Sequence, residues 1–144
     1  MSVQATMSRL KGRLNDLAEE QIENRLEDMA DYAIRISPVD TGAYVESFSI
    51  KRAGQGGGRR KSSEARENGV RKGTGGANPE SFRAEAYSNL NADIQALNIS
   101  DMVEQGNVRI TLRNRSPHAR DVEDGANWRS SGYHVFARIR RKFG

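Results

Sequence analysis

The chain has 144 residues, which is enough for one domain with one hydrophobic core and too few for two substantial ones. No apolar run approaches the roughly 20 residues of a membrane span, and the first residues lack the apolar stretch of a secretory signal. We therefore expect no membrane contact and a cytoplasm-like compartment. With no Cys and only two His, a disulfide framework is excluded and a metal site is disfavoured, so no cofactor is implied. The formal net charge of +4 is modest but unevenly placed along the chain.

The first predicted element is a long amphipathic helix. Its acidic side chains lie on the other face, so one side should be buried and the other wet. At about 1.5 Å per residue the helix would span roughly 45 Å. It should end at Ser37, because the residue before Pro38 avoids the helical region. Gly12 has no evident packing reason, which favours a helix start or bend there and a separate arm before it. The apolar positions that predict the helix recur every three or four residues: Met7, Leu10, Leu14, Leu17, Ile22, Leu26, Met29, Ala33 and Ile36.

A tight turn follows the helix, formed by Pro38, Asp40, Thr41 and Gly42. Pro38 stops the helix, the Asp40 carboxylate can accept hydrogen bonds from backbone amides just after it, and Gly42 permits a positive φ. These properties predict a fixed corner. A strand over residues 45–50 should come next, since Phe48 and Ile50 alternate with small polar positions.

The same Asp40-Thr41-Gly42-Ala43 sequence also occurs as the nucleophile-activating motif of retroviral-type aspartic proteases. In those dimeric enzymes two carboxylates meet and share a proton, and the glycines at 56–58 could serve as a flap. However, such enzymes have a strand of bulky aliphatic residues before the aspartate, whereas a helix and a proline precede Asp40. Short motifs also mislead often. We therefore favour the structural corner and expect that the chain is not an enzyme.

Residues 54–78 form a basic, glycine-rich segment with six basic residues against two acidic ones and almost nothing apolar. This composition predicts a flexible loop within a single domain that spans 1–144. Its simplest interpretation is a solvated insertion, and the alternative is a segment that orders against a partner. The candidate contacts are Arg59, Arg60, Lys61, Arg71 and Lys72.

A second helix is predicted from Pro79, with Asn78 as its cap and with Phe82, Ala86, Leu90, Ile94 and Leu97 at helical spacing. It should pack on the sheet. The clearest strand pattern follows at 108–114, where apolar and polar residues alternate. Pro117 breaks this strand, and residues 118–124 should form a short helical turn that Gly125 closes.

The tail from Tyr133 to Phe143 has apolar residues at helical steps beside four basic ones. It predicts a short basic amphipathic helix, with a strand and basic tail as the alternative. Together these elements predict an α+β fold: a long N-terminal amphipathic helix and further helices packed on a small, mostly antiparallel sheet.

Two segments resemble the neck and tail-completion proteins of tailed bacteriophages. The first is the Pro-Val-Asp-Thr-Gly-Ala turn after the N-terminal helix, with the Ser-Phe strand that follows it, and the second is the run from Pro117 to Gly125. The likeness covers roughly 20–52 and 107–136. It implies a structural virion protein, assembled in the host cytoplasm, that forms a homo-oligomeric ring between head and tail.

The resemblance also implies partners and surfaces. The ring would contact other neck proteins, such as a portal-side adaptor, a tail terminator or the tail tube. The basic loop would face the channel and make non-specific contact with packaged DNA, since a ring multiplies its charge. A small basic nucleic-acid-binding protein is the alternative, although it lacks interleaved aromatic residues for base stacking. The interface candidates are Leu14, Leu17, Trp128, Tyr133 and Phe136.

Overall fold

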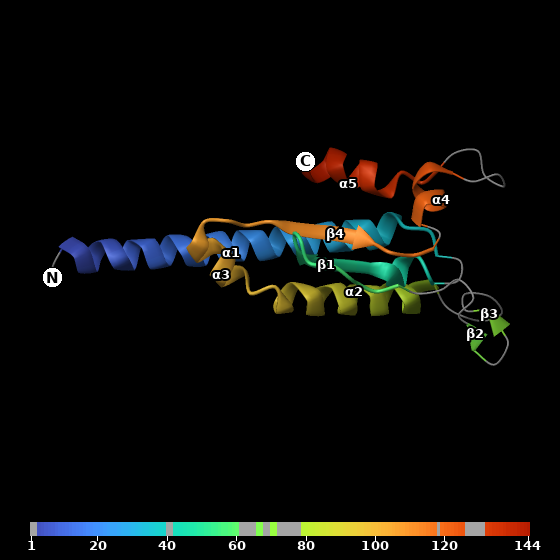
Figure 1. Ribbon diagram of the computed structural model, residues 1–144, viewed down its shortest axis with the longest axis horizontal. Helices are drawn as coiled ribbons and strands as arrows, with labels where there is room; N and C mark the ends of the chain where they lie inside the picture. The colour runs from blue at the N-terminus through green and yellow to red at the C-terminus, as the bar shows by residue number, and fades with distance from the viewer. Residues whose placement is uncertain are drawn as a thin grey trace.

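A long helix with a compact body around its C-terminal half makes up the protein (Figure 1). The computed structural model describes residues 3–39, 42–60, 66–67, 70–71, 79–117, 119–125 and 132–144. The fold is α+β and rich in helix, as the sequence predicts. Its elements are α1 (Val3–Ile36), the 3₁₀ turn η1 (Val45–Ser47), β1 (Phe48–Arg52), β2 (Arg66–Glu67), β3 (Val70–Arg71), α2 (Pro79–Ala96), α3 (Ile99–Gln105), β4 (Ile110–Asn114), α4 (Ala119–Asp124) and α5 (Val135–Phe143).

Helix α1 runs without interruption from Val3, so the expected start or bend at Gly12 is wrong. No atom outside the local backbone comes within 4 Å of a Cβ built on Gly12, because this part of the helix stands free of the body. The helix ends at Ile36 as predicted, and the Ser37 hydroxyl donates to the Ala33 carbonyl at 2.5 Å.

The predicted strand over residues 45–50 begins late. Residues 45–47 form η1, and the strand starts at Phe48. The alternating burial is also wrong at its start, because Ser47 and Ser49 are as deeply buried as Phe48 and Ile50. The Ser47 hydroxyl bonds the Ala43 carbonyl, and the Ser49 hydroxyl accepts the amide of Arg59, so small polar residues satisfy the backbone where large ones would not fit.

Strands β1 and β4 pair antiparallel, with Phe48 opposite Asn114 and Ile50 opposite Leu112. The predicted strand at 108–114 is confirmed from Ile110 on, while Val108 lies before it and is exposed. On one face of this sheet, Phe48 and Ile50 are part of the hydrophobic core, and the partly buried Ile110 and Leu112 pack against that core.

Helix α2 covers the sheet and α1 together, and α3 closes the core beside α1 (Figure 1). The predicted apolar positions of α2 are all buried: Phe82, Ala86, Leu90, Ile94 and, just after the helix, Leu97. The sequence analysis predicted no element at α3. The expected cap Asn78 lies outside the described residues.

Between β1 and α2, two very short strands pair as Arg66 with Arg71 and Glu67 with Val70. This hairpin lies within the segment predicted as a flexible basic loop over 54–78. Residues 58–59 of the same segment lie against Ser49. The rest of the basic segment, 61–65, 68–69 and 72–78, lies outside the described residues.

The C-terminal tail forms a helix, as first predicted, and not a strand. Val135 and Ile139 of α5 are buried, and the helix packs on α1. The short helix α4 precedes it. As the sequence predicted, Gly125 closes α4: its φ is 96°, and its backbone N–H donates a hydrogen bond to the Asp121 carbonyl.

Candidate assembly surface

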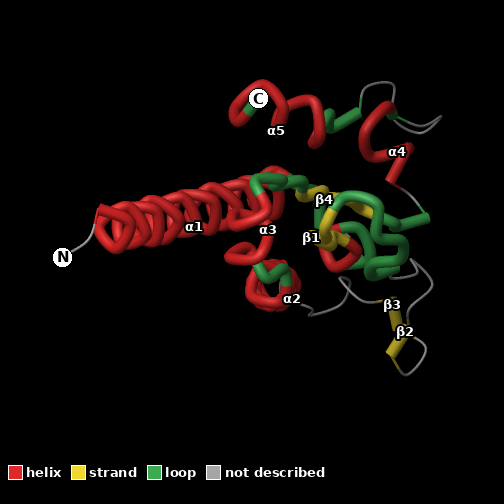
Figure 2. Tube along the Cα trace, turned by 60° about the vertical axis from the view of Figure 1, so that its left-hand side comes forward, coloured by secondary structure: helices red, strands yellow, loops and turns green. Residues whose placement is uncertain are grey.

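The N-terminal half of α1 projects beyond every other element of the fold (Figures 1 and 2). Four large apolar side chains lie on it in contact with water: Met7, Leu10, Leu14 and Leu17, each between 53% and 61% exposed. The sequence analysis placed this stripe on a buried side, and within one chain that prediction is wrong. Single exposed apolar residues are common on protein surfaces, whereas a contiguous exposed apolar patch often marks an interaction site.

The four residues, named here the α1 stripe, follow steps of three, four and three. Alternating steps of three and four residues are typical of the seam of a coiled coil, in which a second helix packs its own apolar side chains between those of the first. Gly12 is two residues from both Leu10 and Leu14, so it lies on the opposite side of the helix. The stripe is therefore uninterrupted.

Further along the chain, α5 covers the same side of α1. Leu14 and Tyr32 are 18 residues apart, or five full helical turns, which aligns them. The Tyr32 ring meets the Phe143 ring at 5.8 Å between centroids, and Arg25 donates to the Phe143 carbonyl. Thus α5 packs on the C-terminal continuation of the stripe, and among the described residues the four side chains of the stripe stay exposed.

Charge is segregated along the projecting half of α1. Residues 9–13 contain three basic side chains and no acidic one, whereas 16–23 contain four acidic side chains and no basic one. Two identical helices in register would bring like charges together. A staggered or antiparallel neighbour brings the basic segment of one copy to the acidic segment of the other, which stabilises the contact.

The structure describes Pro38 and Gly42, which begin and end the predicted corner. Pro38 follows the last turn of α1, and Gly42 has φ of 80° and accepts the amide of Glu46 on its carbonyl. A Cβ on Gly42 would lie 2.5 Å from the Phe82 ring, so glycine is required by packing as well as by conformation. Asp40 and Thr41 lie outside the described residues.

The second motif that carried the resemblance positions α5. The Glu123 carboxylate accepts the amides of Phe136 and Ala137 at 2.9 and 3.1 Å, which satisfies the free N–H groups of the first turn of α5. The Val122 carbonyl accepts the Tyr133 amide at 2.7 Å. The sequence analysis missed this role because a cap from another helix has no local spacing signal.

Aromatic rings connect this C-terminal unit to the corner. Tyr44 meets Phe48 edge to face at 5.3 Å, and Phe48 meets Phe136 at 6.1 Å. The Tyr44 hydroxyl is buried and has no hydrogen-bond partner in the part of the chain that the structure describes. Its burial, and then the negative charge of Glu123, raise the pKa of Tyr44 well above its ordinary value. The hydroxyl stays neutral, which suits a packing role.

The predicted interface residues are distributed unevenly. Leu14 and Leu17 lie together on the stripe. Phe136 and Tyr133 are half-buried against the core of their own chain, so they are less available to a partner. Trp128 lies outside the described residues.

The predicted basic contacts also divide. Arg59 binds both carboxylate oxygens of Asp93 at 2.6 and 2.7 Å and donates to the carbonyls of Phe48 and Asn89, so its guanidinium is used within the chain. Arg60 is exposed. The backbone of Arg71 is in β3, while Lys61 and Lys72 lie outside the described residues.

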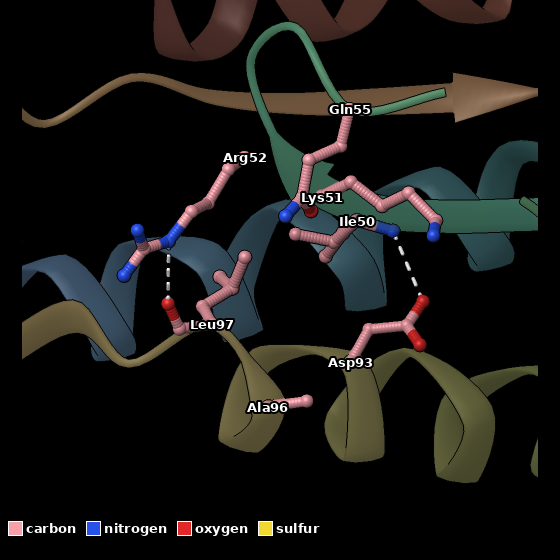
Figure 3. A pocket seen from close by; sticks show the side chains of 7 residues that line it. All are labelled: Ile50, Lys51, Arg52, Gln55, Asp93, Ala96 and Leu97. Carbon is pink, nitrogen blue, oxygen red and sulfur yellow. Dashed lines mark hydrogen bonds between the residues drawn. The ribbon is translucent and has the colours of Figure 1, made fainter. Parts of the chain in front are cut away.

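A small cavity of about 140 Å³ opens beside β1 (Figure 3). Two of the groups that line it hold β1 to the α2 side: the Ile50 amide donates to Asp93, and the Arg52 side chain donates to the Leu97 carbonyl. These bonds cap the outer edge of β1 in place of a third strand. The cavity is therefore structural.

Among the described residues, no group of three or more His, Cys, Asp or Glu side chains could hold a metal ion. None of the helices in that part of the chain has an apolar stretch long enough to cross a bilayer. Comparisons with protein-family models, with curated proteins and with solved structures gave no match.

Proposed function

We propose that the protein is a structural subunit of a tailed bacteriophage, a neck or tail-completion protein that assembles into a ring joining head and tail. The observation that carries this proposal is the α1 stripe, four large apolar residues on a projecting helix that the described part of the chain leaves exposed. A protein that works by assembly needs such a surface.

The resemblance at the two motifs supports the same proposal. Pro38 and Gly42 turn the chain at the end of α1. Glu123 caps the first turn of α5, and Gly125 closes α4. Both motifs build the body from which α1 projects, and each has a packing reason. The corner packs against Phe82, which favours a structural role for the Asp40-Thr41-Gly42 sequence over a protease motif.

The energetics favour several contacts per subunit over one. Burying the exposed half of four such side chains contributes roughly 4 kcal/mol in total, at about 1 kcal/mol each. Association costs at least about 4 kcal/mol in lost freedom of motion, so the stripe alone gives weak pairing. In a closed ring each subunit has two neighbours, and repeated weak contacts then give a stable assembly.

The partners and location follow from the proposal. The subunit would contact copies of itself within the ring and other neck proteins, a portal-side adaptor, tail terminator or tail tube, on either side. It would be assembled in the host cytoplasm and end in the neck or tail of the virion. No cofactor takes part.

The decisive experiment is native mass spectrometry of the full chain and of the double variant Leu14→Ser/Leu17→Ser. We expect concentration-dependent rings for the parent chain, and monomers with an unchanged circular dichroism spectrum for the variant. Negative-stain images of the parent should show closed rings with a central hole.

A matched control replaces two exposed apolar residues that are not part of the α1 stripe, Tyr87→Ser/Val108→Ser. This variant should still form rings, because the loss of exposed apolar area is similar but lies elsewhere. A parent chain that stays monomeric at high concentration would overturn the proposal. Dimers without ring closure would overturn the ring while leaving the stripe as a contact surface.

A further inference from the structure

The face of the β1–β4 sheet opposite the core has a different character from the α1 stripe. Alternation along the strands places Ser49, Lys51, Thr111 and Arg113 on this face, and Arg115 continues the row just beyond β4. Arg113 and Arg115 both reach the carbonyls of the segment that lies over Ser49, at Gly57 and Gly58. The two arginines therefore lie side by side on one surface.

We name Lys51, Arg113 and Arg115 the basic sheet face. Arg59 is not part of it, because its guanidinium binds Asp93 and its amide donates to the Ser49 hydroxyl. None of the three side chains of the basic sheet face forms an ion pair with a carboxylate of the residues that the structure describes.

We infer that the basic sheet face binds the phosphate backbone of a nucleic acid, without reading its sequence. Residues two apart on a strand are about 6.7 Å apart, so Arg113 and Arg115 form a row along an extended edge, as a phosphate chain requires. Among the described residues, each arginine gives one nitrogen to a backbone carbonyl, at 3.2 and 3.3 Å, so the rest of each guanidinium can bind phosphate oxygens.

An acidic protein fits this surface less well. Protein interfaces have an apolar centre with a polar rim, whereas the residue that lies opposite Lys51 and two positions from Arg113 here is the polar Thr111. The absence of exposed aromatic side chains among these residues also leaves no platform for base stacking, which agrees with contact to the backbone alone. The inference does not depend on ring assembly, although a ring would repeat the surface and strengthen the binding.

The test measures binding of a short fluorescent DNA duplex of arbitrary sequence by fluorescence anisotropy, over a series of salt concentrations. The full chain should bind at low salt and lose affinity linearly on a log–log plot. For Arg113→Gln/Arg115→Gln, we expect an affinity loss of about tenfold or more and a salt slope smaller by roughly 2, since each lost phosphate contact removes about 0.9.

Two further variants separate the site from net charge and from folding. Arg140→Gln/Arg141→Gln removes the same charge from exposed positions of α5 and should keep the affinity of the parent chain. Arg113→Lys/Arg115→Lys changes the same positions but keeps the charge, and it should bind nearly as well as the parent.

Three outcomes would overturn the inference: no salt-dependent binding by the parent chain, equal losses in the two glutamine variants, or equal losses in the glutamine and lysine variants at 113 and 115. If the chain captured an acidic protein but bound no DNA, the first of these outcomes would apply. Because Arg113→Gln/Arg115→Gln leaves the α1 stripe intact, rings should persist in it, so failure here is distinguishable from failure of the assembly proposal.

Discussion

The two halves of α1 show the same apolar periodicity and have opposite environments. In the C-terminal half, Leu26, Ala30, Ala33 and Ile34 are buried against α2 and α3. In the N-terminal half, the α1 stripe is in water. Leu14 and Ile34 are 20 residues apart, which places them on nearly opposite sides of the helix.

The residue types differ in a way that explains the two environments. The buried half uses alanine at positions with almost no exposure, so neighbouring helices approach closely. The exposed half uses leucine and methionine, which project far from the helix axis, as the apolar side chains of a coiled-coil seam do. Periodicity therefore predicts which side of a helix is apolar, and side-chain size helps to indicate whether that side is already packed.

The largest difference between the two halves of α1 is expected when the same negative charge is placed in each. Ala33→Glu puts an unpaired carboxylate where no water reaches, and we expect a loss of several kcal/mol in the free energy of unfolding, enough to unfold much of the chain. Leu17→Glu should keep its melting temperature within a few degrees and lose only self-association. Thermal unfolding followed by circular dichroism measures both, and similar destabilisation by the two substitutions would contradict the division of α1.

A smaller effect is expected at the corner that ends the buried half. Gly42→Ala forces a positive φ on alanine and brings its Cβ against the Phe82 ring, and we expect a loss of about 2 to 3 kcal/mol. Urea unfolding gives the value. Phe82→Leu removes the ring, so a double-mutant cycle should show that Gly42→Ala costs less in that background. Additive losses would mean that conformation alone, without the contact, requires glycine.

Much of the fold could be predicted from local signals. The end of α1, the start and apolar face of α2, strand β4 and the helical tail each follow from periodicity or from a proline. The start of β1 was missed because Ser47 and Ser49 are buried through hydrogen bonds to segments nearby in space, and α3 was missed because seven residues give little periodicity.

The candidate surfaces were only partly predictable for a related reason. Leu14 and Leu17 could be named from the sequence, but their exposure depends on where the rest of the chain packs. Arg59 looked free from the sequence because its partner, Asp93, is 34 positions away. The basic sheet face depends on the pairing of β1 with β4, and Glu123 on the approach of α5. Contacts between distant segments carry no local pattern.

The smallest expected effect tests the free half of α1 by itself. Gly12 lies inside the helix, and nothing comes within 4 Å of a Cβ built on it. Gly12→Ala therefore adds a methyl group to open space and removes a glycine that costs about 1 kcal/mol in a helix interior. We expect slightly more helix by circular dichroism and slower amide exchange over residues 9–16, with exchange in α2 unchanged, because the projecting half frays independently of the core. A change of protection in α2 would mean that the two halves of α1 unfold as one unit. An unchanged rate at 9–16 in the monomeric Leu14→Ser/Leu17→Ser background would mean that fraying does not limit exchange there.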